Sequence, residues 1–235
     1  MSAEDGLQEL HAAWRRNFAQ TLAQARNHHA LAALLAAQAY DAYTRNAEIF
    51  SDGQPDCACK RGCDTCCCLQ VAASAPEIFH AAHFIRLTAE AFARNRVNLA
   101  HRVRAVLPAI AGKDQQQRFA SGVGCPLLIG GACAIYAARP LACRGHIAFD
   151  AEACRSAAKG EDVEATISLV HRDIRAIVQT SLLAAMQDAG LVTDVYEFLG
   201  ALDFALHTPD AELRWRRGED IFAAFELTDP QGGVT

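Results

Sequence analysis

The placement of ten cysteines is the strongest constraint in this sequence of 235 residues. Six lie in a short segment, loop one, at residues 57–68, four lie within residues 125–154, and the rest of the chain has none. Cysteines that act as small core hydrophobes should scatter along buried faces, and these do not. A disulfide framework suits small exported domains, whereas this chain is long enough to build an ordinary core. The clustering therefore predicts soft-metal ligation by thiolates, meaning zinc or iron–sulfur.

Composition and charge narrow the class of protein further. Hydrophobic residues make up 51% of the chain and charged residues 21%, which suits a folded core and excludes disorder throughout. A net charge of −5 lacks the basic surplus of nucleic-acid-binding proteins, and no apolar run is long enough to span a membrane. The first residues are acidic and do not have the pattern of an export signal. We therefore expect a cytoplasmic protein with reduced thiols and no nucleic-acid or membrane partner.

Hydrophobic periodicity predicts helices on both sides of the cysteine-rich region. Residues 4–50 carry two apolar stripes with helical spacing, separated by a break at Asn27-His28-His29. Ser74 and Glu77 have the spacing of a capping box and mark the start of another helix. Four further helices are expected. One ends before Gly112, and one runs through Ile167 and Ile177 and ends near Gly190. One runs through Val195 and Leu202, and the last extends from Thr208-Pro209 to about Phe225.

No alternating strand pattern of useful length is found, so the predicted fold class is all-α. We expect a helical bundle with two cysteine-rich irregular loops that converge on a metal site. The second of them, loop two, spans residues 121–148 and is rich in glycine. The chain is expected to form a single domain, 1–235, with a cysteine-cluster metal-binding core at 57–146 and flanking helices at 1–50 and 161–226.

The spacing of the cysteines indicates how each loop could hold a metal. Cys63 and Cys66 form a C-x-x-C pair, which lets two thiolates bind one ion. The side chains of the three successive cysteines at 66–68 diverge, so at least one of them is spare or serves a second site. In loop two the cysteines are separated by steps of eight and ten residues, which fits ligands gathered from an irregular loop.

The cysteine pattern of the two loops is long enough to be compared with known families. It reads Cys59-x3-Cys63-x2-Cys66-Cys67 in loop one, and Cys125-Pro-Leu, then Cys133-x-Ile-Tyr136-x-x-Arg139-Pro140-x-x-Cys143-Arg144 in loop two. This pattern resembles the bacterial YkgJ-type cysteine-cluster proteins, also called the CxxCxxCC family, whose domain is described as chelating zinc or iron. The resemblance covers residues 57–146, about two fifths of the chain.

The resemblance implies a set of metal ligands and leaves three cysteines outside it. The implied ligands are the cysteines of the shared pattern: Cys59, Cys63, Cys66, Cys67, Cys125, Cys133 and Cys143. Cys57 and Cys68 are extra to the pattern, and Cys154 is not assigned by it. Arg139 and Arg144 flank one of the ligands and are expected to lie just behind the metal, where positive charge lowers thiol pKa values. His146 follows the motif as a further candidate ligand.

The implied cofactor is an iron–sulfur cluster, a 4Fe–4S cluster first, or zinc. Ligand count does not separate the two, because a cubane cluster and a closed zinc site each take four ligands. The Cys125-Pro126 dipeptide is similar to the Cys-Pro of ferredoxin-type binding runs and favours iron.

Three functions follow for such a centre. The first is a metal-binding protein for electron transfer, redox sensing or metal handling, with a protein redox partner. The second is an interaction protein in which structural zinc only shapes the loops. The third is a methyl- or radical-transfer enzyme that uses S-adenosylmethionine, because Cys59, Cys63 and Cys66 also have the spacing of the radical-enzyme triad. Those enzymes sit on a β/α barrel, which the helical pattern does not predict, and we assign no catalytic residue.

Overall fold

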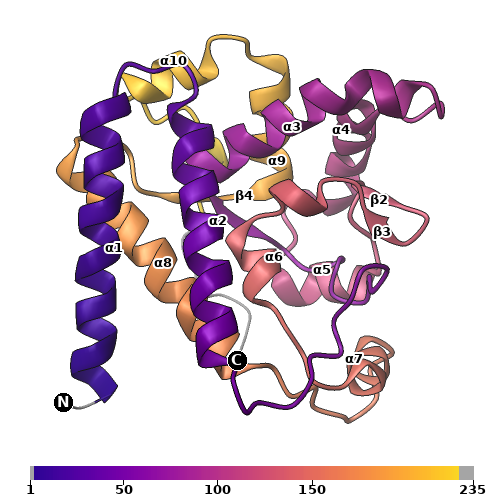
Figure 1. Cartoon of the computed structure of the whole chain (residues 1–235). Coiled ribbons are helices and arrows are strands. Elements are labelled where there is room, and N and C mark those ends of the chain that lie inside the picture. The colour runs from indigo at the N-terminus through magenta and orange to yellow at the C-terminus, as the bar shows by residue number, and fades with distance from the viewer. Residues whose placement is uncertain (1–2, 228–235) are drawn as a thin grey trace.

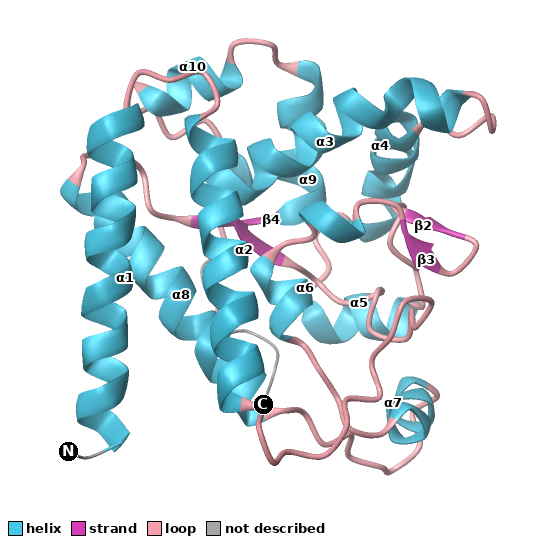
Figure 2. Ribbon diagram, in the orientation of Figure 1, coloured by secondary structure: helices cyan, strands magenta, loops and turns pink. Residues whose placement is uncertain are grey.

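The computed structural model describes residues 3–227 and is mostly helical, with a few short strands (Figure 1, Figure 2). The helices are α1 (Ala3–Ala25), α2 (Leu31–Phe50), α3 (Ala75–Ala93), α4 (Leu99–Ile110), α5 (Gln115–Ser121), α6 (Leu141–Gly145), α7 (Ala151–Ala158), α8 (Leu169–Asp188), α9 (Phe198–His207) and α10 (Ala211–Arg216). The strands are β1 (Ala72–Ser74), β2 (Leu128–Ile129), β3 (Ala132–Cys133) and β4 (Val195–Glu197), and two 3-10 turns occupy Tyr136–Ala138 and Ala223–Phe225. The predicted helical character is confirmed.

Helices α1, α2 and α8 pack side by side and form one half of the molecule (Figure 1). Their contacts bury Phe18, Leu35 and Val178 completely. The chain leaves helical structure between α1 and α2 at residues 26–30, which confirms the predicted break. Helix α8 also packs against α6 of loop two, so this helical layer supports the cysteine-rich region.

Helices α3, α4 and α9 form the other half, which joins the first through the contact of α2 with α3. An aromatic cluster closes this half, because the ring of Phe79 lies 5.6 Å from that of Trp215 and 5.3 Å from that of Phe222. Helix α3 begins with the predicted capping box, in which the N–H and the hydroxyl of Ser74 both donate to Glu77 Oε2. The cap sets the point at which the chain leaves loop one and becomes helical.

The strands correct the prediction that the chain has none. Strand β1 pairs antiparallel with β4, with Ser74 opposite Val195, so Val195 lies in a strand and the next helix begins only at Phe198. Strands β2 and β3 form a hairpin whose two-residue turn, Gly130-Gly131, has φ angles of 57° and 75°. Left-handed φ angles at both turn positions suit glycine, so this Gly-Gly pair was the sequence signal for the hairpin.

The last predicted helix is shorter than expected. Helix α10 ends at Arg216, because the chain turns at Gly218, whose φ of 90° is in the left-handed region. The segment after this turn brings Phe222 into the aromatic cluster instead of continuing the helix. The tail predicted to fray, from Asp229, lies outside the described residues. That residues 1–235 form a single domain, with the inner boundaries given above, stays a prediction.

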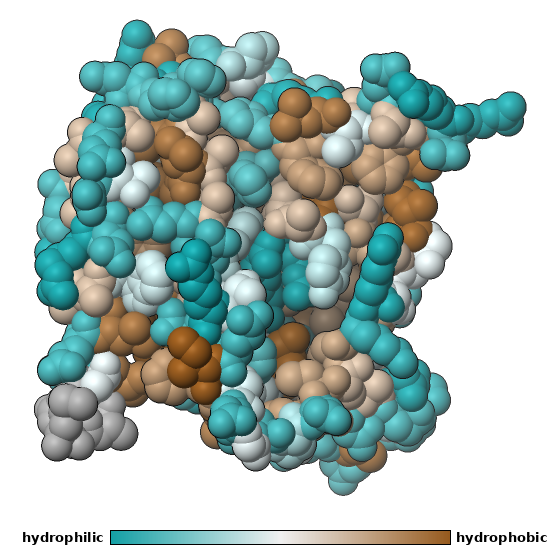
Figure 3. Space-filling model, viewed as in Figure 1, coloured by the Kyte–Doolittle hydropathy of each residue, from teal (hydrophilic) through white to brown (hydrophobic). Residues whose placement is uncertain are grey.

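The cysteine loops and the short helices α5, α6 and α7 lie together at one end of the molecule, opposite the α3–α10 end (Figure 2). The face of the molecule in Figure 3 mixes hydrophilic and hydrophobic side chains. Among the described helices, none has the length and apolar character to cross a membrane.

Candidate metal centre

Loop one is a series of tight turns that contains no helix or strand. The N–H of Cys63 donates to the carbonyl of Lys60, and the N–H of Cys67 donates to the carbonyl of Asp64, both at 2.9 Å. These turns bring Cys63, Cys66 and Cys67 to the same cavity wall. The C-x-x-C pair thus lies in a segment of consecutive tight turns.

Loop two is more ordered than the irregular segment that the sequence predicted. Cys125 precedes the β2–β3 hairpin, Cys133 is the last residue of β3, and Cys143 lies in the middle of α6. The intervals of eight and ten residues in the sequence therefore correspond to a hairpin and to a turn followed by a short helix. A loop residue, a strand and a short helix thus carry the three thiols of this loop.

Backbone hydrogen bonds hold the two loops against each other. The N–H of Cys125 donates to the carbonyl of Cys67 at 2.7 Å, and the N–H of Ala58 donates to the carbonyl of Ala148 at 2.9 Å. The N–H of Ala148 in turn donates to the sulfur of Cys59 at 3.3 Å. Segments that are far apart in the sequence are thus joined on both sides of the cysteine cluster.

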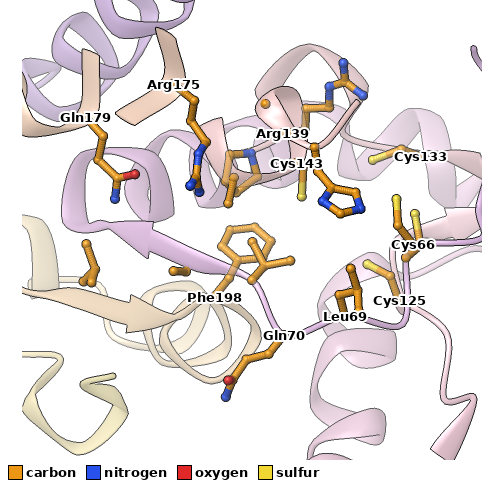
Figure 4. A pocket seen from close by; sticks show the side chains of 18 of the residues that line it. Cys66, Leu69, Gln70, Cys125, Cys133, Arg139, Cys143, Arg175, Gln179 and Phe198 are labelled. Carbon is orange, nitrogen blue, oxygen red and sulfur yellow. The ribbon is translucent and has the colours of Figure 1, made fainter. Parts of the chain in front are cut away.

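A cavity of about 930 Å³ lies between the loops and α8. The cysteines that line it are the seven of the family pattern: Cys59, Cys63, Cys66, Cys67, Cys125, Cys133 and Cys143. Cys57, Cys68 and Cys154, the three left outside that pattern, do not line it. In the close view of the cavity, Cys66, Cys125 and Cys133 gather at one end, and Cys143 lies between them and Arg175 (Figure 4).

The thiols share this cavity without forming a ready-made coordination sphere. In residues 3–227, no three histidine, cysteine, aspartate or glutamate side chains are arranged to hold a metal ion. The shared cavity is a feature of the structure, whereas convergence on a metal site stays a prediction. Cysteine side chains would have to rotate towards one another for a metal to be bound.

Burial and mutual proximity keep the thiols of Cys66, Cys125 and Cys143 protonated at neutral pH. Burial raises the pKa of Cys125 to about 11 and raises the pKa of Cys143 well above its usual range. Neighbouring thiols, among them Cys66 and Cys133, raise the pKa of Cys143 further. The pKa of Cys66 is also raised, first by its hydrogen bond with Cys67 and then by burial. Binding of a metal cation to these sulfurs would therefore release protons.

Backbone amides oppose part of this effect at Cys125 and Cys133, as the N–H of Ala148 does at Cys59. Burial raises the pKa of both Cys125 and Cys133. The N–H of Leu127 faces the Cys125 sulfur and lowers the pKa of that thiol, and the N–H of Ile135 does the same for Cys133. In both cases the amide belongs to the second residue after the cysteine. A hydrogen bond to sulfur favours the charged thiolate, which is the form that binds metals.

Arg139 lies where the sequence predicted a cation, beside the cavity thiols. Burial raises the pKa values of Cys133 and Cys143, and the Arg139 charge acts in the opposite direction on both. Its guanidinium stacks on the ring of Tyr136 at 4.1 Å, and its Nε is buried with no partner among the described residues. Arg139 thus supplies positive charge to the sulfur end of the cavity.

Arg144 instead braces the backbone of loop two. It donates to the carbonyls of Arg139 and Ala137, and its guanidinium lies over the ring of Tyr40 at 4.0 Å. The hydroxyl of Tyr43 donates to the carbonyl of Arg144 at 2.6 Å. These contacts connect α6 to helix α2 and hold the helix that carries Cys143.

Two residues that anchor the site were not recognised from the sequence. Glu77 was predicted only as a cap, yet its Oε1 also accepts the N–H of Leu141 at 2.7 Å, so one buried carboxylate holds the starts of both α3 and α6. Arg118 is 4% exposed, lines the cavity and forms an ion pair with Glu197 at 3.3 Å. No sequence signal marked either role, because each partner is remote along the chain.

The remaining candidates lie at the margins of the cluster. Cys57 is exposed, and its sulfur lies 3.8 Å from Nε2 of His171, a residue that the sequence did not single out. Burial raises the pKa of Cys154, and the nearby thiols Cys59, Cys66 and Cys63 raise it further. His146 lines the cavity, and burial lowers its pKa, which favours the neutral imidazole that binds metals.

The donor set of the cavity suits a thiophilic metal. Its sulfur end combines seven thiols with an imidazole and with amides that face three of the sulfurs. It also includes an arginine whose buried Nε has no partner in the described part of the chain. Soft thiolate ligands select zinc and iron–sulfur clusters over calcium or magnesium. Fold and site together describe a helical protein with a cavity that is lined by cysteines.

Comparison with known proteins gives one match. Residues 58–165 match the family described as "CxxCxxCC: Putative zinc- or iron-chelating domain". The match is to the family that the cysteine pattern predicted, and it extends that prediction to residue 165. No curated protein and no solved structure matches the chain.

Proposed function

We propose that this protein binds an iron–sulfur cluster or zinc through thiolates drawn from both loops. One observation carries the proposal: the cysteines that line the cavity are those of the family pattern, and the three cysteines outside the pattern do not line it. The ligands come from this set: Cys59, Cys63, Cys66, Cys67, Cys125, Cys133 and Cys143. A centre that takes ligands from both loops cross-links the helical framework and stabilises the folded state by several kcal/mol or more, on the order of 10 kcal/mol.

The residues of this chain prepare the thiols for that role. The amides of Leu127 and Ile135 favour the thiolates of Cys125 and Cys133, and the charge of Arg139 favours the thiolates of Cys133 and Cys143. Glu77 and Arg144 hold the helix that presents Cys143. A bound iron–sulfur cluster supplies one-electron transfer, whereas bound zinc supplies a structural or Lewis-acid site.

The function that we favour is electron transfer or redox sensing by a 4Fe–4S cluster, and the second is metal handling. A zinc site with a purely structural role is closed around its ion, whereas here a large cavity remains beside the thiols. An open side gives a redox partner or a small molecule access to the centre.

Elemental analysis after anaerobic purification tests this proposal. We expect a brown protein with iron and acid-labile sulfide in stoichiometric amounts. A colourless protein with stoichiometric zinc supports the structural-zinc interaction protein instead. Purified full-length protein that holds neither metal, and takes up neither on reconstitution under reducing conditions, contradicts the proposed function.

A further inference from the structure

The cavity extends well beyond the sulfur end. Its volume of about 930 Å³ is in the range of sites that hold small organic molecules, and far exceeds what one thiolate-bound centre occupies. Helix α8 and the segment from β4 to α9 form the other end. Figure 4 shows Arg175 and Gln179 entering this end from α8, on the side away from Cys133 and Cys66.

Arg175 is a half-buried cation that has no partner within residues 3–227. Among the described residues its guanidinium makes no hydrogen bond or ion pair, and burial lowers its pKa. The charge of the Glu77 carboxylate acts on Arg175, but the two oxygens of Glu77 already accept hydrogen bonds from Leu141 and Ser74. Its neighbour Arg172 carries the same charge and pairs with Asp173. Withdrawing a charged guanidinium from water without giving it a partner costs free energy. The planar N–H donors of a guanidinium match the two oxygens of a carboxylate, so a carboxylate is a suitable partner.

The fold holds Arg175 in this position through a glycine. A Cβ atom at Gly145 would come within 2.7 Å of Cβ and Cδ of Arg175. Only glycine therefore lets α6 lie directly on the aliphatic stem of this arginine. Cys143 lies two residues earlier in α6, so one helix contact positions both the cation and a thiol.

The surroundings of Arg175 suit an organic anion rather than a bare ion. Gln179 is one helical turn further along α8, faces the same cavity, and its side chain makes no hydrogen bond among the described residues. Phe198, which is 3% exposed, and Leu183 supply apolar walls. At the rim, Asp194 and Glu226 are exposed to solvent, which screens their negative charge.

We propose that the α8 end of the cavity binds a small organic carboxylate. The carboxylate pairs with Arg175, the amide of Gln179 adds a hydrogen bond, and the apolar part of the molecule lies against Phe198 and Leu183. The ligand shares its cavity with the thiols. This inference goes beyond the proposed function and does not depend on it, since every contact comes from the protein itself.

Calorimetric titration of the full-length protein with phenylacetate tests the inference. The neutral isostere phenylacetamide serves as the ligand control, and the exposed, ion-paired Arg45 supplies the matched control variant, R45Q. We expect phenylacetate to bind at least about tenfold more tightly than phenylacetamide, because the guanidinium–carboxylate pair is lost with the amide. R175Q should weaken phenylacetate binding by at least about tenfold, R175K by less, and R45Q should leave it unchanged.

Metal content is measured on each variant so that the two proposals fail separately. Equal binding of phenylacetate and phenylacetamide, equal binding to wild type and R175Q, or no binding to wild type would each overturn the carboxylate subsite. If R175Q loses bound metal and wild type does not bind phenylacetate, Arg175 is a charge partner of the thiolates and the inference is wrong. If wild type holds no metal but binds phenylacetate through Arg175, the proposed function fails and the subsite stands.

Discussion

The two cysteine loops reach the same cavity but are held in different ways. Loop two is anchored to helices: Glu77 of α3 binds the start of α6, Tyr43 of α2 binds the carbonyl of Arg144, and Arg102 of α4 donates to the carbonyls of Pro126 and Leu128. Loop one is held by short-range turns, and its two long-range backbone hydrogen bonds among the described residues both go to loop two. Loop two is thus a template on which loop one is placed.

This difference implies that the thiols of loop two are already in place without metal, whereas those of loop one would be fixed only when metal binds. The thiols of loop two are positioned by a hairpin and a helix that the core already supports. The thiols of loop one depend on turns and on contacts with loop two, so they have more freedom to rotate towards a metal. Four predictions test this comparison, beginning with the largest expected effect.

Replacement of Cys143 by serine should have the largest effect. The variant loses the central thiol of loop two, so we expect loss of bound metal and a fall in melting temperature of roughly 10 °C or more. Elemental analysis and thermal unfolding measure the two effects. Cys68→Ser is the matched control, because Cys68 does not line the cavity and should leave metal content unchanged. Full metal content in Cys143→Ser would show that the loops do not share a site.

Replacement of Glu77 by glutamine tests whether loop two is the template. An amide cannot accept hydrogen bonds from both Ser74 and Leu141 as the carboxylate does, so a buried N–H loses its acceptor at a cost of about 1–3 kcal/mol. Urea unfolding of the metal-free protein should show this decrease in the free energy of unfolding. The affinity for metal should also decrease. The exposed Glu90 on the same helix provides the control Glu90→Gln, which should change neither.

In the metal-free protein, cysteine-to-serine changes in the two loops should have different effects on the free energy of unfolding. Burial of the Cys125 thiol means that Cys125→Ser places a hydroxyl in a poorly solvated site, at a cost of about 1–2 kcal/mol in the free energy of unfolding. Cys63→Ser, in the turns of loop one, should change that free energy by less than about 0.5 kcal/mol. Both should weaken metal binding. Equal destabilisation of the metal-free protein by the two changes would contradict the difference between the loops.

The smallest effect concerns His80, which lies behind loop two. Burial lowers its pKa from 6.5, and the charges of His83 and Arg144 lower it further. Its ring packs edge-on against Tyr40 at 5.6 Å, and its buried Nδ1 has no partner among the described residues.

Because the folded state disfavours protonation of His80, stability should fall as the pH drops below about 6.5, where the unfolded chain binds the proton first. Urea unfolding at pH 7.5 and 5.5 measures this slope. His80→Gln should reduce it, whereas His101→Gln, at an exposed position, should not. An unchanged slope in His80→Gln would assign the acid sensitivity to other groups, such as His146 and His171, whose pKa values burial also lowers.

Local patterns were sufficient to predict the helical class, the break near residue 27, the capping box at Ser74 and the family of the cysteine-rich domain. Each of these depends on residues close together in the sequence, where spacing alone determines which side chains share a turn or a helix face. The β2–β3 hairpin was missed although its Gly130-Gly131 turn is local. Pairing of β1 with β4 could not be predicted, since neither segment has enough residues for a strand pattern.

The sequence by itself determined that thiols cluster in two segments of a helical chain, because clustering and periodicity are properties of neighbours. Only the tertiary structure decided which thiols share a cavity, that Glu77 holds α6, and that Gly145 lies against the side chain of Arg175 at the end of the cavity away from Cys66 and Cys133 (Figure 4). These features arise from groups brought together from distant parts of the chain. Their energies depend on burial and on three-dimensional distance, which no local pattern records.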